Sequence, residues 1–167
     1  MRLLRLIFFL LPGSLIAAAP LSEGKPAPDF HVTGPGATTL RAWRDRARVV
    51  IVFAPRKAGP ESEATKWTQQ QKNFGESGVP AAFADRDLVV VVVSDGTGSW
   101  APGLKLARPV DGTAAAVRLA YGVGNEQFLA LLVGKDGDIK KVSSEAFRAA
   151  ELFAIIDSMP MRRQEMK

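Results

Sequence analysis

The stretch VVIVFAPRKAGPESEA, residues 49–64, decides the fold of this chain. It opens on an apolar run rich in β-branched residues, which extends over residues 47–54. Such a run is typical of a strand that is buried on both faces, at the centre of a parallel sheet covered by helices. A loop follows, and then the start of a helix. Pro60 suits the first helical position, and Glu61 and Glu63 favour the positive end of the helix dipole.

A second apolar run, LVVVVV at residues 88–93, has the same character. Between the two runs, Trp67, Gln71 and Phe74 recur along one face of the expected helix. A strand, a helix and a second buried strand form a parallel pair joined by a right-handed crossover. The two strands are therefore expected to lie in one sheet, with this helix packed on it.

The remaining segments extend the same architecture. The glycine- and proline-rich stretch at residues 94–112 is long for a connection, so we expect it to be functional or mobile. A short helix is expected over residues 113–123. A hairpin with a turn at Asp136 and Gly137 is expected over residues 127–142, and its second strand carries two lysines, as edge strands do. A final amphipathic helix follows, ended by Pro160.

The composition excludes several kinds of chemistry. With 167 residues, 47% of them hydrophobic and 23% charged, the chain is expected to form one globular domain. It contains no cysteine, which excludes disulfides, thiolate metal sites and cysteine nucleophiles. Its single histidine, His31, excludes a polyhistidine metal site. The lysines and arginines are scattered, so nucleic acid is not an expected partner.

The first 18 residues have the pattern of a secretory signal peptide. Arg2 and Arg5 precede a short apolar run that ends in small residues, and no stop-transfer pattern follows. We expect residues 1–18 to be removed and residues 19–167 to form the mature domain, with no membrane span left. The mature charge falls from +5 to +3 because both arginines are lost. The expected location is periplasmic or secreted.

The order of these elements is that of the thioredoxin fold, a three-layer α/β sandwich with a central mixed sheet and helices on both faces. The string GKPAPDF at residues 24–30 resembles the entry segment of peroxiredoxins and periplasmic thioredoxin-like proteins. Residues 49–64 resemble the segment that carries C-G-P-C in thioredoxins. On that pattern Ala58, Gly59, Pro60 and Glu61 occupy the motif positions, with alanine in place of the nucleophile and glutamate in place of the resolving cysteine.

The second hallmark of the thioredoxin fold, a cis-proline before the hairpin, is missing too. Gln127 or Phe128 falls where that proline would be. A cis bond before a residue other than proline costs roughly 2.5–4 kcal/mol, so a trans peptide is expected there. Thiol–disulfide exchange needs a thiolate, so neither disulfide reductase nor thiol peroxidase activity is expected.

Four strings together resemble a more specific family, the peroxiredoxin-like P-DUDES domains, in its bacterial branch. They are RVVIVFAP (48–55), DRDLVVVVV (85–93), FLALLVGKDGDIK (128–140) and LFAIIDSMPMRRQEM (152–166). The resemblance implies a secreted thioredoxin-like domain of unknown function without a redox motif, related to domains of vertebrate sushi-repeat and matrix proteins. It supplies no catalytic residues, and we expect no cofactor and no metal site.

The leading functional hypothesis is a binding or interaction module whose partner is an envelope protein or another envelope component. The candidate binding residues are Arg56, Lys57, Glu61, Trp100, Met159, Met161, Arg162 and Arg163. Each of these also fits an ordinary solvated loop or a packed helix end. One alternative is a cysteine-free enzyme that uses Glu61 and Arg56. A further alternative is a copper carrier with Met159, Met161 and Met166 as thioether ligands.

Overall fold

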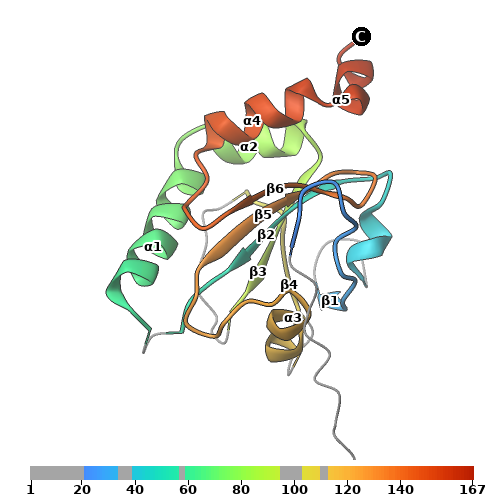
Figure 1. The fold of residues 1–167 in the computed structure, drawn as a ribbon. Coiled ribbons are helices and arrows are strands. Elements are labelled where there is room, and N and C mark those ends of the chain that lie inside the picture. Colours follow the sequence, from blue (N-terminus) through green and yellow to red (C-terminus); the bar gives the residue numbers. More distant parts are fainter. Residues whose placement is uncertain (1–20, 34–38, 57–58, 95–102, 110–112) are drawn as a thin grey trace, which may run out of the picture.

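The computed structural model describes residues 21–33, 39–56, 59–94, 103–109 and 113–167 (Figure 1). Twelve elements are formed in these segments. They are β1 (Val32–Thr33), the 3-10 helix η1 (Leu40–Trp43), β2 (Arg48–Phe53), α1 (Glu61–Gly75), α2 (Val79–Asp85), β3 (Leu88–Val93), β4 (Leu106–Pro109), α3 (Ala114–Ala120), β5 (Leu129–Val133), β6 (Ile139–Ser143), α4 (Ala149–Ser158) and α5 (Pro160–Glu165).

The strands form one mixed sheet in the order β1-β4-β3-β2-β5-β6. The two apolar runs are its centre: β2 pairs in parallel with β3, in register from Arg48 with Leu88 to Phe53 with Val93. β3 pairs in parallel with β4, whereas β5 is antiparallel to both β2 and β6. The parallel centre follows from strands that, apart from Arg48 at the start of β2, are apolar and are covered on both sides.

Alternate residues of the central strands face two separate cores. Val50 and Val52 pack with residues of α1, α2 and α4, including Phe74, Phe83 and Leu152. Ile51 and Phe53 point the other way, into a core that η1 and α3 cover. Successive side chains of a strand point to opposite faces, so a run of valines supplies both cores at once. Figure 1 shows α1, α2 and α4 on one side of the sheet and α3 on the other.

The outer edge of β6 is covered by the first described segment of the chain. The Gly24 N–H donates to the carbonyl of Ile139 (2.8 Å), and the Ile139 N–H donates to the carbonyl of Lys25 (2.8 Å). The Glu23 carboxylate accepts a hydrogen bond from the Val142 N–H at 3.4 Å. These contacts satisfy main-chain groups that would otherwise offer an edge for pairing with another chain.

The predicted architecture is confirmed: an α/β sandwich with helices on both faces, a parallel central pair and a hairpin over β5 and β6. No cis peptide occurs in the described ranges, so the bonds at Gln127 and Phe128 are trans, as expected. Residues 106–109, which were expected in a loop, form β4, and neither α2 nor α5 was predicted. None of the helices in the described segments is long and apolar enough to cross a membrane.

Candidate functional site

The described motif positions, Gly59, Pro60 and Glu61, lie where three main-chain segments meet at one end of the central strands. β2 and β3 both end here, at Phe53 and Val93, and β5 begins here at Leu129. The loop after β2 leads into α1, and the loop over residues 124–128 leads into β5. In open α/β sheets, the carboxyl ends of parallel strands are the usual place for ligand sites. In Figure 1 this end of the central strands is at the bottom, at the lower end of α1.

Gly59 allows the loop before α1 to approach the loop before β5. A Cβ built on Gly59 would lie 3.1 Å from the Cβ of Glu126 and 3.1 Å from the carbonyl oxygen of Arg56. The two loops are also joined directly, because the Arg56 N–H donates to the carbonyl of Asn125 (3.1 Å). The glycine of the motif is therefore retained for a packing reason, the close approach of two backbones.

Glu63 joins α1 to the start of β5. Its carboxylate accepts hydrogen bonds from the Phe128 N–H (2.7 Å) and from Lys66 Nζ (2.9 Å). Lys66 also forms an ion pair with Glu145 at 3.2 Å. The hydrogen bond from Lys66, followed by that from the Phe128 N–H, lowers the pKa of Glu63 below its ordinary value. The carboxylate that faces the loop is thus Glu63, not Glu61.

An open groove of about 690 Å³ runs between α1 and the 124–128 loop. Its walls carry two cations, Arg56 and Lys66, and two carboxylates, Glu63 and Glu126. The full lining is Arg56, Pro60, Ser62, Glu63, Lys66, Gly124, Asn125, Glu126, Gln127, Phe128 and Ser144. The volume is in the range of ligand-binding clefts, although the floor is more polar than in most of them.

A buried arginine of α3 holds the floor of this region together. Arg118 is only 3% exposed. Its guanidinium donates to the carbonyl of Gly124 (2.8 Å), to that of Gln127 (3.3 Å), to that of Ala54 and to that of Val93 (3.4 Å). One side chain therefore fixes the ends of β2 and β3 relative to the loop before β5. The carbonyls of Val93 and Gly124 also accept from the main-chain N–H groups of Ala54 and Gln127, so the charged hydrogen bonds of Arg118 add to these main-chain contacts.

The structure brings some of the predicted site residues to the groove and places others elsewhere. Arg56 and Pro60 line it, and Gly59 lies between them. Glu61 is exposed in the first turn of α1, and the N-cap residue Pro60 forms no side-chain cap hydrogen bond. Lys57, Ala58 and Trp100 lie outside the described residues.

The C-terminal candidates lie at the opposite end of the sheet, on α5. Arg162 is buried, and its guanidinium contacts Asp85 (2.5 Å) and Asp157 (3.5 Å). Arg86 also pairs with Asp157, at 2.7 Å. The hydrogen bond from Arg86 is the main reason that the pKa of Asp157 is lowered. Arg162 therefore holds α5 on the domain and is not a free binding residue, which corrects the expectation for this position.

Glu165, one turn further along α5, closes a second set of ion pairs. Its carboxylate accepts from Lys135 Nζ (2.6 Å) and from both terminal nitrogens of Arg48 (3.2 and 3.3 Å). Lys135 also pairs with Asp87 at 2.9 Å. Burial raises the pKa of Glu165, but the hydrogen bonds from Lys135 and Arg48 outweigh burial and hold this pKa below its ordinary value.

The methionines of the copper hypothesis differ in their surroundings. Met159 is half-buried and packs against the core beneath α4. Met161 is 38% exposed and Met166 is 54% exposed. Arg163 is exposed as well. Nothing in this arrangement favours a shared metal site over separate packing and solvent contacts.

Sequence reasoning missed the buried charges at both ends of the sheet. Arg48 and Arg118 were not singled out, and Lys135 was interpreted only as a polar residue of the hairpin turn; they are 1%, 3% and 8% exposed. The available signal was position: Arg48 starts one central strand, and Lys135 follows the strand paired with it. A charged residue directly beside a fully apolar run is held near the sheet and needs a partner there.

Comparison with solved structures gives the fold a wider context. Plasmodium vivax 2-Cys peroxiredoxin in its reduced form superimposes with a TM-score of 0.54 at 16% identity, covering 87% of this chain and 99% of that chain. A thiol:disulfide interchange protein from Bacteroides sp. superimposes with a TM-score of 0.54 at 16% identity, covering 83% of this chain and 90% of that chain. A putative thiol:disulfide interchange protein DsbE from Chlorobium tepidum superimposes with a TM-score of 0.53 at 18% identity, covering 81% of this chain and 99% of that chain. These likenesses show a thioredoxin-like fold.

Sequence comparison gives a vertebrate relative and a family. The Danio rerio protein "Coiled-coil domain-containing protein 80" is 26% identical over 140 residues, which are 76% of this chain. The chain spans only 15% of that relative's length. The family described as "Domain of unknown function (DUF4174)" matches residues 39–165, from the start of η1 to the end of α5. The chain is thus a thioredoxin-like member of the DUF4174 family.

Proposed function

We propose that this chain is an envelope binding module that takes up a segment of a partner protein in the groove between α1 and the 124–128 loop. The mature domain is residues 19–167, exported by the signal peptide at residues 1–18. No thiol redox chemistry is involved, because the chain has no cysteine to form a thiolate. The observation that carries the proposal is the groove of about 690 Å³ at the position of the degenerate motif.

The construction of the groove supports binding more than catalysis. Glu63, the carboxylate of α1 that faces the loop, is engaged by the Phe128 N–H and by Lys66. Such a carboxylate is held as an acceptor and is not poised as a general acid or base. The same contacts stiffen the groove walls, and a rigid wall reduces the ordering cost of binding.

The charges in the groove favour a polar protein segment over a polyanion. Arg56 and Lys66 are matched by Glu63 and Glu126, so the described residues of the lining carry no net charge. A surface that binds nucleic acid needs an excess of cations to neutralise phosphates. A polar peptide with scattered charges can instead find donors and acceptors along both walls.

Cross-linking in envelope extract tests the proposal. The mature domain, a groove variant with Arg56→Ala and Lys66→Ala, and a matched variant with Arg46→Ala and Lys105→Ala are compared by mass spectrometry of the captured proteins. The matched variant removes the same charge from the opposite end of the sheet, where β2 and β4 begin. We expect one saturable partner with the wild type and the matched variant, and its loss with the groove variant.

Two results would contradict the proposal. Equal loss in both variants would mean that general charge, not the groove, holds the partner. Specific capture that survives in the groove variant would place the binding surface elsewhere. If no protein is captured by any form, the module hypothesis fails and a cysteine-free hydrolytic activity becomes the next hypothesis to assay.

A further inference from the structure

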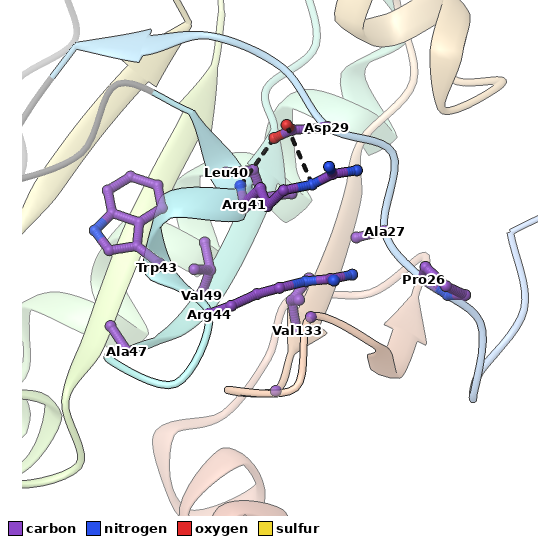
Figure 2. Close-up of a pocket in the computed structure, with 12 residues that line it drawn as sticks. Pro26, Ala27, Asp29, Leu40, Arg41, Trp43, Arg44, Ala47, Val49 and Val133 are labelled. Carbon is purple, nitrogen blue, oxygen red and sulfur yellow. Dashed lines mark hydrogen bonds and ion pairs between the residues drawn. The ribbon is translucent and has the colours of Figure 1, made fainter.

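A small cavity lies at a distance from the groove, beneath the segment that enters the domain (Figure 2). It measures about 70 Å³. η1, the start of β2 and the turn between β5 and β6 surround it, and residues 26–29 close one side. Its floor is apolar and is formed by the buried side chains of Leu40, Trp43, Val49 and Val133.

Two arginines of the segment RAWR, residues 41–44, line this cavity. Figure 2 shows the Arg41 and Arg44 side chains extending in the same direction, toward the backbone that carries Pro26 and Ala27. Their guanidinium groups therefore flank one space. Asp29 is the one carboxylate that lines it.

Asp29 is already engaged. It accepts hydrogen bonds from the Arg41 N–H (2.8 Å) and the Phe30 N–H (3.1 Å), and it forms an ion pair with Arg41 Nε at 3.8 Å. Arg44 differs from Arg41: in the described ranges no carboxylate or carbonyl accepts a hydrogen bond from its guanidinium. The Arg44 guanidinium lies against Gly137, where a Cβ would collide with Arg44 Nε.

These features together select a ligand. The two arginines and Asp29 leave one positive charge at the cavity, which a monoanion neutralises. The planar fork of a guanidinium matches a carboxylate through two parallel hydrogen bonds. The apolar floor suits a ligand whose charged end carries a carbon chain. Phosphate presents oxygen on every side and would leave this floor without an apolar contact.

We propose that this cavity binds the carboxylate of a small organic acid, with Arg44 as the main anchor and the alkyl end on the floor. The cavity volume limits the length of the ligand's alkyl chain. A cavity of about 150 Å³ holds benzene, so about 70 Å³ takes roughly two carbons beyond a carboxylate that stays at the arginines. Propionate is therefore the best-fitting simple probe.

Nuclear magnetic resonance titration of the mature protein tests the proposal, with the Trp43 indole N–H and the Gly137 backbone N–H as reporters, because both residues line the cavity and are kept in every variant. Acetate, propionate and butyrate are added at constant ionic strength. Burial of one methylene is worth a factor of about four, so propionate is expected to bind about fourfold more tightly than acetate. Butyrate is expected to gain nothing more, because the cavity is full.

Arg44→Ala is the decisive variant, and Arg46→Ala is its matched control. Both arginines are exposed, but only Arg44 lines the cavity. We expect Arg44→Ala to weaken propionate at least tenfold and Arg46→Ala to change it by less than twofold. Equal propionate affinities in Arg44→Ala and Arg46→Ala would overturn the proposal that this cavity is the binding site. Tighter binding of inorganic phosphate than of propionate would overturn the carboxylate assignment.

Discussion

Glu165→Gln is the change that tests the attachment of α5 most sharply. The Glu165 carboxylate faces two buried cations, Arg48, whose side chain is 1% exposed, and Lys135, whose side chain is 8% exposed. Removing one partner of a buried ion pair costs about 3–5 kcal/mol, because it leaves a buried charge without compensation. The glutamine keeps the shape and one oxygen acceptor but loses the charge.

Two features of the structure reduce that cost. Lys135 keeps its pair with Asp87 at 2.9 Å, and the Glu165 side chain is itself 27% exposed. Partial solvent screening weakens the lost attraction. We therefore expect a loss of about 2 kcal/mol in the free energy of unfolding, which for a domain of this size lowers Tm by roughly 4–8 °C.

Urea denaturation of the mature domain measures this loss, with Glu151→Gln as the control. Glu151 is exposed on α4, and its substitution is expected to change the free energy of unfolding by less than about 0.5 kcal/mol. A double-mutant cycle that combines Glu165→Gln with Lys135→Met isolates the interaction between these two side chains. We expect a coupling free energy of about 1 kcal/mol or more. If Glu165→Gln matches the control, the ion pairs of Glu165 do not hold α5 on the domain.

Three more predictions concern other parts of the molecule. The pKa values of Glu165 and Asp157 are lowered in the folded state. The stability that these two carboxylates contribute is therefore present above their unfolded-state pKa values, and it is lost as the pH falls through their folded-state pKa values. The urea midpoint is therefore expected to drop progressively below about pH 4, and a flat profile there would count against these pairs. Glu63→Ala removes the acceptor of the Phe128 N–H, so hydrogen exchange at that amide is expected to accelerate at least tenfold, and unchanged protection would refute the link. Arg118→Met removes a guanidinium that bridges four carbonyls, although those of Val93 and Gly124 still accept from main-chain N–H groups, and it is expected to cost about 3 kcal/mol in urea denaturation; a loss below about 1 kcal/mol would refute its role.

The central elements were predictable because each carries its own signal. The apolar runs of β2 and β3 can be buried only on both faces of a sheet, and the structure places alternate side chains in the two cores. The turn at Asp136 and Gly137 predicted the hairpin, in which Gly137 has a φ of 85° that suits glycine. In both cases the local sequence was sufficient to predict the element.

The elements that were missed carry weak or ambiguous local signals. α2 has seven residues, too few to show a helical period, and β4 has four residues in a glycine- and proline-rich stretch. Pro160 was interpreted as the end of the last helix, but it begins α5. Proline is as well suited to the first turn of a helix as to the segment after one.

The buried ion pairs could not be predicted, because their partners are far apart in the sequence. Arg48 and Glu165 are separated by 117 residues, and Arg86 and Asp157 by 71. Charged residues are usually exposed, so without the fold each of these reads as a surface residue. The candidate site shows the same limit, since Glu63 meets Phe128 only after β5 has been placed beside β2.

The proposed binding groove is tested most directly by photo-cross-linking from one chosen position on α1. A photoreactive residue replaces Ser62, which is exposed and lines the groove, or Thr68, which is exposed further along the same helix outside the groove. In envelope extract, the Ser62 position is expected to give one adduct that excess unlabelled domain abolishes, and the Thr68 position is expected to give none. The same adduct from both positions, or none from Ser62, would contradict binding in the groove.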